Sequence, residues 1–312
     1  MTYDCAVVGC GAIGSQFESD ERSEAILTHA AACSAHDDTS LVAGVDTSDR
    51  NRVAFEERWG VPAYATVTEL ATEHNVDLAC ISTPSETHAD AIRAAVDIGV
   101  SGILCEKPVA TETAAGADVV ELCESADVPL AVNYTRRYAP GCRDAREAIR
   151  AGELGSVHRA VFTYTKGFLE NGSHMVDLAR WWFGDLDRVA DARTDVEADA
   201  TLWIDDVACE VVGTGTHTYS YTAVDVYGSE GSLHLIDDGN VLLRRVGQPD
   251  PVFDGFEKLM DDRRFETGIY RALLTALDDL VATVRDGSPL TCSGEDALRT
   301  LEVCEEVLEG SP

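Results

Sequence analysis

The sequence predicts an α/β protein of two domains: a doubly wound parallel sheet, then an α+β domain with a large, open-faced, mostly antiparallel sheet. Two features of the sequence support this prediction. Short apolar runs alternate with segments of helical spacing up to about residue 131, and longer runs of strand-like alternation dominate from about residue 155. The length of 312 residues is enough for two domains of ordinary size.

Five short apolar runs are the expected strands of the first domain. In chain order they are DCAVVGCG, LVAGVD, LACIST, GILCEK and PLAVNY. Three segments with helical spacing lie between them, namely TSDRNRVAFEERWG, ETHADAIRAAVDIG and ETAAGADVVELCESA. Strands that are separated by helices of this length form parallel sheets. We therefore expect residues 1–131 to form the first domain.

Long segments of alternating polarity mark the second domain, residues 132–312. Strands are expected in SVHRAVFTYTKG, in RVADARTDVEA, in the stretch from ATLWIDD to LHLIDD, and in NVLLRRVG. One helix, GSHMVDLARWWFG, interrupts them, and the helices GIYRALLTALDDLVATVRDG and GEDALRTLEVCEEVLEG follow. Such alternation is typical of antiparallel sheets with one solvated face.

Acidic residues dominate the composition, with 56 Asp and Glu against 24 Lys and Arg and a formal net charge of -32. The acids are spread along the chain, which favours a solvated acidic coat, as halophilic proteins have, over an acidic docking surface for a basic partner. Only three of the basic residues are lysines. Nucleic-acid binding is not expected, because phosphate contacts need clustered Lys and Arg.

The remaining composition points to a cytoplasmic protein. No run of 18 apolar residues is present, so we expect no membrane span. The N-terminal MTYDCAVVGCGAIG lacks the basic segment and cleavage site of a leader. The ten cysteines contain no CxxC pair and most lie in apolar runs, so they are interpreted as small hydrophobic residues, and no structural metal is expected.

A GxGxxG motif follows the first expected strand. It consists of Gly9, Gly11 and Gly14, with Ala12 and Ile13 between the last two glycines. In this position the glycines allow a tight turn and a close approach of backbone to a pyrophosphate, at the start of an expected helix. The motif therefore predicts dinucleotide binding, with a simple glycine-rich turn as the alternative.

An acidic partner for the ribose is expected after the second strand. Asp46 ends the run LVAGVD, whereas Asp37 and Asp38 belong to a polar loop. The stretch SDERSEAILTHAAACSAHDDTS lengthens the connection that precedes this strand. A carboxylate at position 46 favours NAD, because it repels a 2′-phosphate, while the nearby Arg50 and Arg52 leave NADP open.

Two further strand ends are expected beside the cofactor. Thr83 and Pro84 follow the third strand, where open α/β sheets bind ligands, and His88 either lines the cofactor site or contacts backbone at its helix start. Glu106 and Lys107, followed by Pro108, end the fourth strand. The proline restricts the conformation of Lys107. An ammonium group there can hold a substrate hydroxyl, with a plain surface lysine as the alternative.

The ordered set VVGCGAIGS, GVD, ISTPSETHADAIRAA, CEKPVA, NYTRRYAP and NGSHMVDLARWWFGD resembles the glucose-fructose oxidoreductase, inositol dehydrogenase and rhizopine catabolism (Gfo/Idh/MocA) family over nearly the whole chain. The resemblance implies an N-terminal Rossmann domain and a C-terminal domain with an open-faced sheet. It also implies NAD(P)-dependent oxidation or reduction of a carbinol carbon in sugars or cyclitols. Lys107 then orients the substrate beside the nicotinamide, and His174 accepts the proton.

The residues around His174 fit that role. His174 opens an expected helix, and Asp177 lies three residues further on, so that the two side chains are neighbours on its surface. A carboxylate there can orient the imidazole, with a structural acid as the alternative. The family has an aspartate four residues before the histidine, whereas Glu170 occupies that position here. Glutamate keeps the carboxylate but reaches farther.

Basic residues near these positions predict an anionic group on the substrate. Lys166 precedes Glu170 in YTKGF and is expected in the pocket, with a sheet-edge lysine as the alternative. Arg136 and Arg137 follow the domain junction. One of this pair is expected to bind the same anion and the other to form a structural ion pair.

The sequence therefore predicts an enzyme with NAD, or NADP, as cofactor and a small polyhydroxylated molecule, a sugar, cyclitol or sugar acid, as substrate. The alternatives are a nucleotide-sugar or keto-sugar reductase, and a regulatory protein that binds NAD(P) without turnover. A homo-dimer or tetramer is expected from the family's habit, because an uncovered sheet with alternating apolar residues favours burial.

Overall fold

The computed structural model describes residues 2–17, 24–193 and 197–310. The chain forms two compact units: Met1–Tyr138 with Tyr270–Arg299, and Ala139–Ile269 with Thr300–Pro312. Residues 270–299 thus fold with the N-terminal part of the chain. The predicted boundary at residue 131 placed them in the second domain instead. Helix α9 (Ala272–Asp286) accounts for this, because it packs on strand β5 (Gly102–Cys105) and helix α1 (His29–Ala35).

The first unit contains a six-stranded parallel sheet in the order β3-β2-β1-β4-β5-β6. Besides β5, its strands are β1 (Tyr3–Val8), β2 (Thr39–Val45), β3 (Ala63–Tyr64), β4 (Leu78–Ile81) and β6 (Leu130–Val132). This is the strand order of a doubly wound sheet of the Rossmann type, so the predicted fold class is confirmed. Strand β3 was not expected, because two residues are too few to form a recognisable apolar run.

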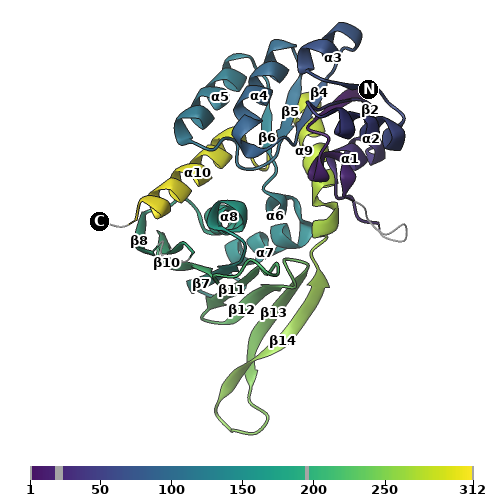
Figure 1. Ribbon diagram of the computed structural model, residues 1–312. Coiled ribbons are helices and arrows are strands. Elements are labelled where there is room, and N and C mark those ends of the chain that lie inside the picture. The colour runs from purple at the N-terminus through teal and green to yellow at the C-terminus, as the bar shows by residue number, and fades with distance from the viewer. Residues whose placement is uncertain (1, 18–23, 194–196, 311–312) are drawn as a thin grey trace. The chain divides into compact units, whose positions relative to one another are not determined.

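Helices cover both faces of this sheet (Figure 1). Besides α1 and α9 they are α2 (Asp49–Trp59), α3 (Val67–Glu73), α4 (His88–Asp97), α5 (Thr113–Ser125) and the short α6 (Thr135–Tyr138). Gly102 shows how closely α9 lies on the sheet: a Cβ atom there would lie 2.8 Å from Val284 Cγ2. The three helices expected between the strands are present as α2, α4 and α5.

The segment after the glycine motif differs from the prediction. The motif leads into a single π-helical turn, η1 (Ala12–Gln16), the chain becomes extended at Phe17, and α1 begins only at His29. The predicted long connection comprises residues 19–40, of which 19–23 lie outside the described residues. A five-residue turn has only a small dipole compared with a full helix. We therefore expect the phosphates to be bound mainly by backbone N–H groups of the turn.

The second unit contains an eight-stranded sheet in the order β14-β13-β12-β11-β7-β10-β9-β8. Neighbouring strands are antiparallel except for β7 and β10, as predicted for a mostly antiparallel sheet. The strands are β7 (Val157–Tyr164), β8 (Arg188–Arg193), β9 (Asp199–Ile204), β10 (Val207–Gly213), β11 (Ala223–Gly228), β12 (Gly231–Ile236), β13 (Val241–Pro249) and β14 (Glu257–Glu266).

Helix α8 (Ser173–Phe183) packs against β7 and β10 in this unit, and it is buried over most of its length. Arg146 of α7 (Pro140–Arg150) fixes it from outside, because Nε donates to Trp181 O at 2.8 Å and the guanidinium stacks over the Trp181 ring. Helix α10 (Gly294–Glu309) contributes residues to both units.

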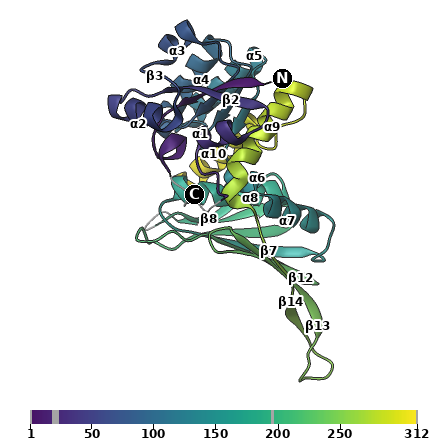
Figure 2. The same ribbon diagram turned by 90° about the vertical axis from the view of Figure 1, so that its right-hand side faces the viewer.

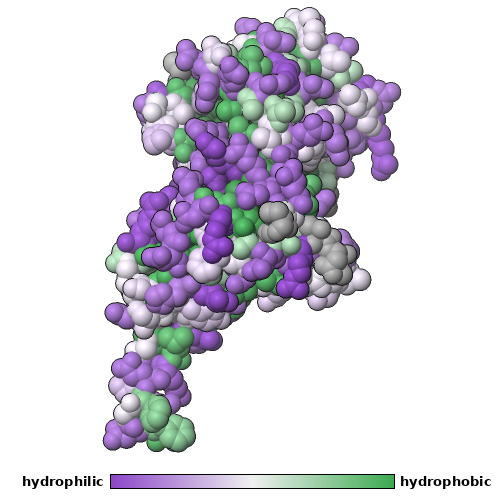
Figure 3. All heavy atoms as spheres, turned by 90° about the vertical axis from the view of Figure 1, so that its left-hand side faces the viewer, coloured by the Kyte–Doolittle hydropathy of each residue, from purple (hydrophilic) through white to green (hydrophobic). Residues whose placement is uncertain are grey.

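Strands β13 and β14 form a long two-stranded ribbon at the edge of the sheet (Figure 2). The sequence did not predict β14, since EKLMDDRRFE has no period of apolar residues. The structure explains why: nine of its ten residues are exposed. Apolar side chains gather at the end of the ribbon (Figure 3), where Val252, Phe253 and Phe256 are 75%, 64% and 69% exposed.

All ten cysteines are buried and free, as their interpretation as small hydrophobic residues predicted. In the part of the chain that the structure describes, no His, Cys, Asp and Glu side chains form a group of three or more suited to a metal ion. Within the same residues, no helix combines the length and the apolar character that crossing a bilayer requires.

Candidate functional site

The glycine motif forms a tight turn at the carboxyl end of β1. Gly9 has φ +100°, and a Cβ atom on it would lie 2.6 Å from Thr83 N, so only glycine fits there. Ser82 Oγ donates to Gly9 O at 2.8 Å and ties this turn to the end of β4. Around Gly11, by contrast, no atom of the described residues other than its chain neighbours lies within 4 Å of a Cβ position. The space over Gly11 is open to a ligand.

Asp46 lies where a ribose partner is expected, directly after β2. Its Oδ2 accepts from Cys10 N at 2.9 Å and from Asn51 Nδ2 at 3.0 Å, and its Oδ1 accepts from Ser48 N at 2.8 Å. The carboxylate is thus fixed next to the glycine turn. Arg52, one of the two arginines that left NADP open, donates to Asp46 O at 2.7 Å and forms an ion pair with Asp49.

Thr83 and His88 connect the end of β4 to the loop after β5. The buried ring of His88 places Nε2 2.9 Å from Thr83 O and Nδ1 2.7 Å from Pro108 O. His88 therefore contacts backbone at its helix start, which was one of its two predicted roles. Pro84 is exposed beside it. The Oγ1 atom of Thr83 is buried and has no hydrogen-bond partner among the described residues.

Glu106 and Lys107 follow β5, and the Lys107–Pro108 peptide bond is cis. Glu106 Oε1 lies 2.9 Å from Nε2 of the fully buried His29 and accepts from Asn133 Nδ2 at 2.8 Å. Burial alone would raise the pKa of Glu106, but the hydrogen bond and charge of His29, together with Asn133 and Lys107, hold the pKa below its usual range.

The same contact acts on His29. Burial disfavours its charged form, but the interactions with Cys80 and Glu106 outweigh burial and raise the pKa of His29 to about 9. Both shifts favour the form of the pair in which the imidazole is protonated and the carboxyl group is ionised. Glu106, the acidic partner of this pair, directly precedes Lys107 in the chain, and Lys107 is the residue expected to hold the substrate.

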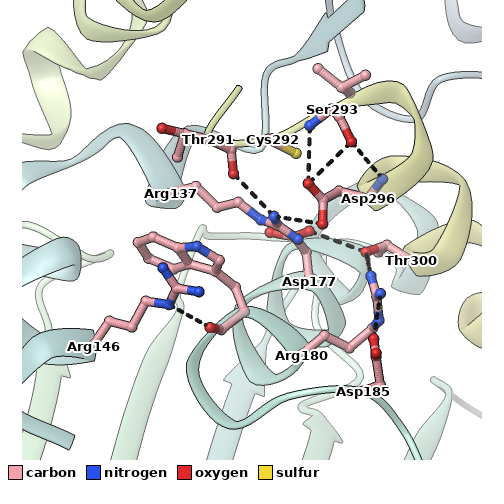
Figure 4. A network of polar contacts seen from close by, with 12 residues as sticks. Arg137, Arg146, Asp177, Arg180, Asp185, Thr291, Cys292, Ser293, Asp296 and Thr300 are labelled. Atoms are coloured by element: carbon pink, nitrogen blue, oxygen red, sulfur yellow. Dashed lines mark hydrogen bonds and ion pairs between the residues drawn. The ribbon is translucent and has the colours of Figure 1, made fainter. Parts of the chain in front are cut away.

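Arg136 and Arg137 are both buried in α6. Arg137 Nη1 lies 3.3 Å from Asp296 Oδ1 and donates to Thr291 O at 3.2 Å (Figure 4). Asp296 is fixed at the start of α10, where its backbone N–H donates to Ser293 Oγ at 3.1 Å and its Oδ2 accepts from Ser293 N at 3.1 Å. The prediction that one of the two arginines forms an ion pair is confirmed for Arg137.

In the second unit, an irregular loop joins β7 to α8. Lys166 has φ +64°, which is unusual for a residue other than glycine, and Gly167 has φ +96°. A π-helical turn, η3 (Phe168–Gly172), follows and leads directly into α8 at Ser173. Such backbone conformations are enriched at functional sites. The predicted residues Lys166, Glu170 and His174 all lie in this segment.

Glu170 lies in η3, and His174 follows four residues later in the first turn of α8. Glu170 is exposed, and its carboxylate folds back over Gly167, where a Cβ atom would lie 3.1 Å from Glu170 Cδ. The glycine thus makes room for the Glu170 side chain. His174 is half-buried, with its Nδ1 atom inside the protein. Lys166 is exposed at the other end of the loop.

Asp177 is buried in α8, and Thr300 of α10 donates to its Oδ1 at 3.1 Å (Figure 4). Arg180 Nη1 in turn donates to Thr300 Oγ1 at 2.8 Å. These contacts hold α8 against the C-terminal part of α10 within the second unit. They correspond to the structural role that was the alternative for Asp177. Its predicted action on His174 stays a prediction.

Sequence reasoning missed several residues of these networks, among them His29, Asn133 and Thr300. His29 lies in the stretch interpreted only as a lengthened connection, although THAAACSA places a histidine at a helix start. Asn133 ends the fifth expected strand, a position that could have been assigned by the argument applied to Thr83. Nothing in the sequence marks Thr300, because its partners lie more than 100 residues away in the chain.

These features of the first unit fit a dinucleotide. The open space over Gly11, the fixed Asp46 carboxylate and the buried Thr83 hydroxyl lie at the carboxyl ends of β1, β2 and β4. That edge is where doubly wound sheets bind their ligands. The loop that carries Glu106 and Lys107 ends the next strand of the same sheet.

Comparison with known proteins agrees with this geometry. Residues 3–134 match the model of an oxidoreductase family described as an NAD-binding Rossmann fold, and residues 165–311 match the C-terminal alpha/beta domain of the same family. The rhizopine catabolism protein MocA of Rhizobium meliloti is 27% identical over 80% of each chain. The inositol 2-dehydrogenase of R. meliloti strain 1021 is 23% identical over 98% of this chain and 96% of that protein.

Among solved structures, the WlbA dehydrogenase from Bordetella pertussis, in complex with NADH and UDP-GlcNAcA, superposes with a TM-score of 0.80. The superposition covers 99% of this chain and 95% of the WlbA chain, and the sequence identity is 18%. At this identity the likeness shows the fold alone.

Proposed function

The chain belongs to the Gfo/Idh/MocA oxidoreductase family, which joins an NAD-binding Rossmann domain to a C-terminal alpha/beta domain, and we propose that it is an NAD(P)-dependent dehydrogenase of a sugar, cyclitol or sugar acid. One observation carries the proposal. Gly9 packs against Thr83, and His88 ties Thr83 to Pro108, so the glycine turn and the Lys107 loop form one connected edge of the sheet. The relatives named inositol 2-dehydrogenase support the substrate class.

The cofactor would be held by residues of the first unit. The turn at Gly9, Gly11 and Gly14 suits the pyrophosphate, Asp46 suits the ribose hydroxyls, and Thr83 and Glu106 suit the nicotinamide side. We propose NAD as the preferred cofactor, because the fixed carboxylate of Asp46 repels a 2′-phosphate and Arg52 is already engaged by Asp46 O and Asp49. When bound, the nicotinamide exchanges a hydride with the carbinol carbon.

Side chains of the protein would accept the proton of the substrate hydroxyl and stabilise the charge on its oxygen. The Lys107 ammonium group holds the substrate oxygen and stabilises negative charge that develops on it. His174 takes the hydroxyl proton as general base, and Glu170 helps to orient the imidazole. Lys166 and Arg136 suit an anionic group on the substrate, such as a carboxylate. A nucleotide-sugar substrate would present a phosphate to the same cations.

A substrate screen tests this proposal. Absorbance at 340 nm would be followed with NAD and NADP at high KCl, over polyols, aldoses, sugar acids and nucleotide sugars. We expect turnover with at least one sugar, cyclitol or sugar acid and a preference for NAD. Turnover confined to nucleotide sugars would favour the alternative substrate class. Cofactor binding without turnover across the panel would contradict the proposed enzyme and favour a regulatory protein.

The acidic coat predicts a salt requirement. With a net charge of -32, like-charge repulsion opposes the compact state at low ionic strength. Raising KCl from about 0.2 M to about 2 M shortens the screening length from below ~10 Å to ~3 Å or less. We therefore expect the urea midpoint of unfolding to rise steadily over this range. A midpoint that stays constant or falls would argue against a halophilic adaptation.

We further propose that the protein forms a homo-oligomer through the β13–β14 ribbon. A two-stranded ribbon is only marginally stable by itself in water, and beyond Val246, where pairing of β13 with β12 ends, this ribbon exposes Phe253 and Phe256. Residues 241–266 carry five basic and six acidic side chains, so this segment is nearly neutral in a chain of charge -32. Two copies can meet there with little repulsion.

Light scattering after size exclusion at high KCl tests the oligomer. The wild type is expected at a multiple of 33.5 kDa, and Phe253→Ser with Phe256→Ser is expected to lower the mass. Tyr219→Ser is the matched control, because Tyr219 is 57% exposed outside the ribbon. A wild-type mass of 33.5 kDa, or an unchanged mass in the double variant, would contradict the assignment.

A further inference from the structure

Three buried side chains surround the loop that carries Lys107. His29 of α1 and Asn133, after β6, both contact Oε1 of Glu106, at 2.9 Å and 2.8 Å. His88 of α4 contacts Pro108 O at 2.7 Å. The residues before and after Lys107 are therefore fixed by contacts from separate elements of the first unit. The contacts that His29 and Asn133 make with Glu106 have no part in the catalytic roles proposed above.

The two contacts on Glu106 fall on the same oxygen. Oε1 is occupied by His29 and Asn133, whereas no hydrogen bond to Oε2 is found among the described residues, and the side chain is 14% exposed. The second oxygen of a carboxylate held in this way can accept a hydrogen bond from a bound ligand. A hydroxyl or carboxamide of the nicotinamide nucleoside is such a donor.

Stability alone does not explain why a histidine, rather than an apolar residue, is buried against Glu106. A buried ion pair is often no more stable than a packed apolar pair, because both charges lose their hydration. His29 is 0% exposed and interacts with Cys80 and Glu106. An apolar pair could fill this space, but it could not fix the direction of a charged acceptor.

We propose that His29 is a positioning residue for the cofactor: together with Asn133 it fixes Glu106 so that Oε2 faces the nicotinamide nucleoside and Lys107 is held beside it. The inference rests on the proposed cofactor role of Glu106. It assigns His29, which lies outside the glycine motif and the Glu106–Lys107–Pro108 loop, to the same binding site.

NADH fluorescence titration at fixed KCl tests the proposal. Asn133→Ala removes a neutral donor to Oε1, and His29→Leu removes the charged one. We expect each to raise the Kd for NADH, on the order of tenfold for His29→Leu and less for Asn133→Ala. His29→Gln keeps an N–H donor and is expected to recover most of the affinity. His36→Gln, at the other end of α1, is the matched control and should bind as the wild type does.

A double-mutant cycle shows whether His29 acts through Glu106. In a Glu106→Leu background the proposal predicts that His29→Leu has no further effect on the Kd. This background also removes the unpaired carboxylate, so it keeps the test valid if His29→Leu alone does not fold. A Kd for His29→Leu equal to that of the wild type, or a His29→Leu effect that persists unchanged in the Glu106→Leu background, would overturn the proposal. Absence of NADH binding in the folded wild type would instead overturn the proposed function.

Discussion

Replacing His174 by Asn is expected to lower kcat by roughly 10²–10⁴-fold, because a positioned general base contributes about that much to proton transfer. His174 belongs to the second unit, whereas the residues assigned to the cofactor belong to the first. The Kd for NADH should therefore remain close to that of the wild type. The measurement is steady-state turnover on the substrate found in the screen, with cofactor binding followed in parallel.

Lys107→Met is the companion variant, expected to lower kcat/KM strongly through the loss of the charge that holds the substrate oxygen. The chain offers matched controls for both changes. Lys258→Met alters an exposed lysine in β14, and His158→Asn alters an exposed histidine in β7. Both should keep wild-type activity. If the His174→Asn variant retained activity within about threefold of the wild type, His174 would be excluded as the general base.

His29→Leu is expected to reduce the free energy of unfolding by about 3–5 kcal/mol, because it removes the buried imidazole that lies against the Glu106 carboxylate. The double variant His29→Leu/Glu106→Leu should recover most of this loss, since an apolar pair of similar volume often replaces a buried ion pair without cost. Urea unfolding at constant KCl measures both. His36→Gln is the control, because Asp278, its partner, is largely exposed.

A loss below about 1 kcal/mol in His29→Leu would show that the ion pair contributes no more than a surface contact. A double variant as unstable as the single one would show that the cost comes from poor packing of the introduced leucine rather than from the charge of Glu106. Either result would remove the energetic basis for the buried pair, independently of any effect on the cofactor.

The sequence predicted the first sheet well because its strands are buried on both faces. Such strands are continuous apolar runs, and the turn residues at their ends, Gly9, Thr83 and Lys107, mark the edge where ligands bind. The prediction failed where local pattern and tertiary structure differ. Strand β14 is exposed almost throughout, so its residues carry no alternation. Helix α9 packs with the first unit although it follows the second along the chain.

The candidate site was predicted less completely than the fold. Motif residues were found because each has a chemistry that its position needs, as Asp46 has at the end of β2. The residues that fix them were missed, because their contacts span large separations: His29 meets Glu106 across 77 residues, and Thr300 meets Asp177 across 123. Only the fold brings such pairs together, and a single sequence has no local signal for them.

Every role proposed for these residues depends on the first unit binding a nicotinamide dinucleotide as the cofactor of a dehydrogenase. The decisive measurement is a titration of the folded wild type with NADH and NADPH at high KCl, followed by cofactor fluorescence. We expect saturable binding at one site per chain, tighter for NADH because of Asp46, and weakened when Gly9→Ala fills the turn against Thr83. A folded protein that binds neither cofactor would contradict the proposed function.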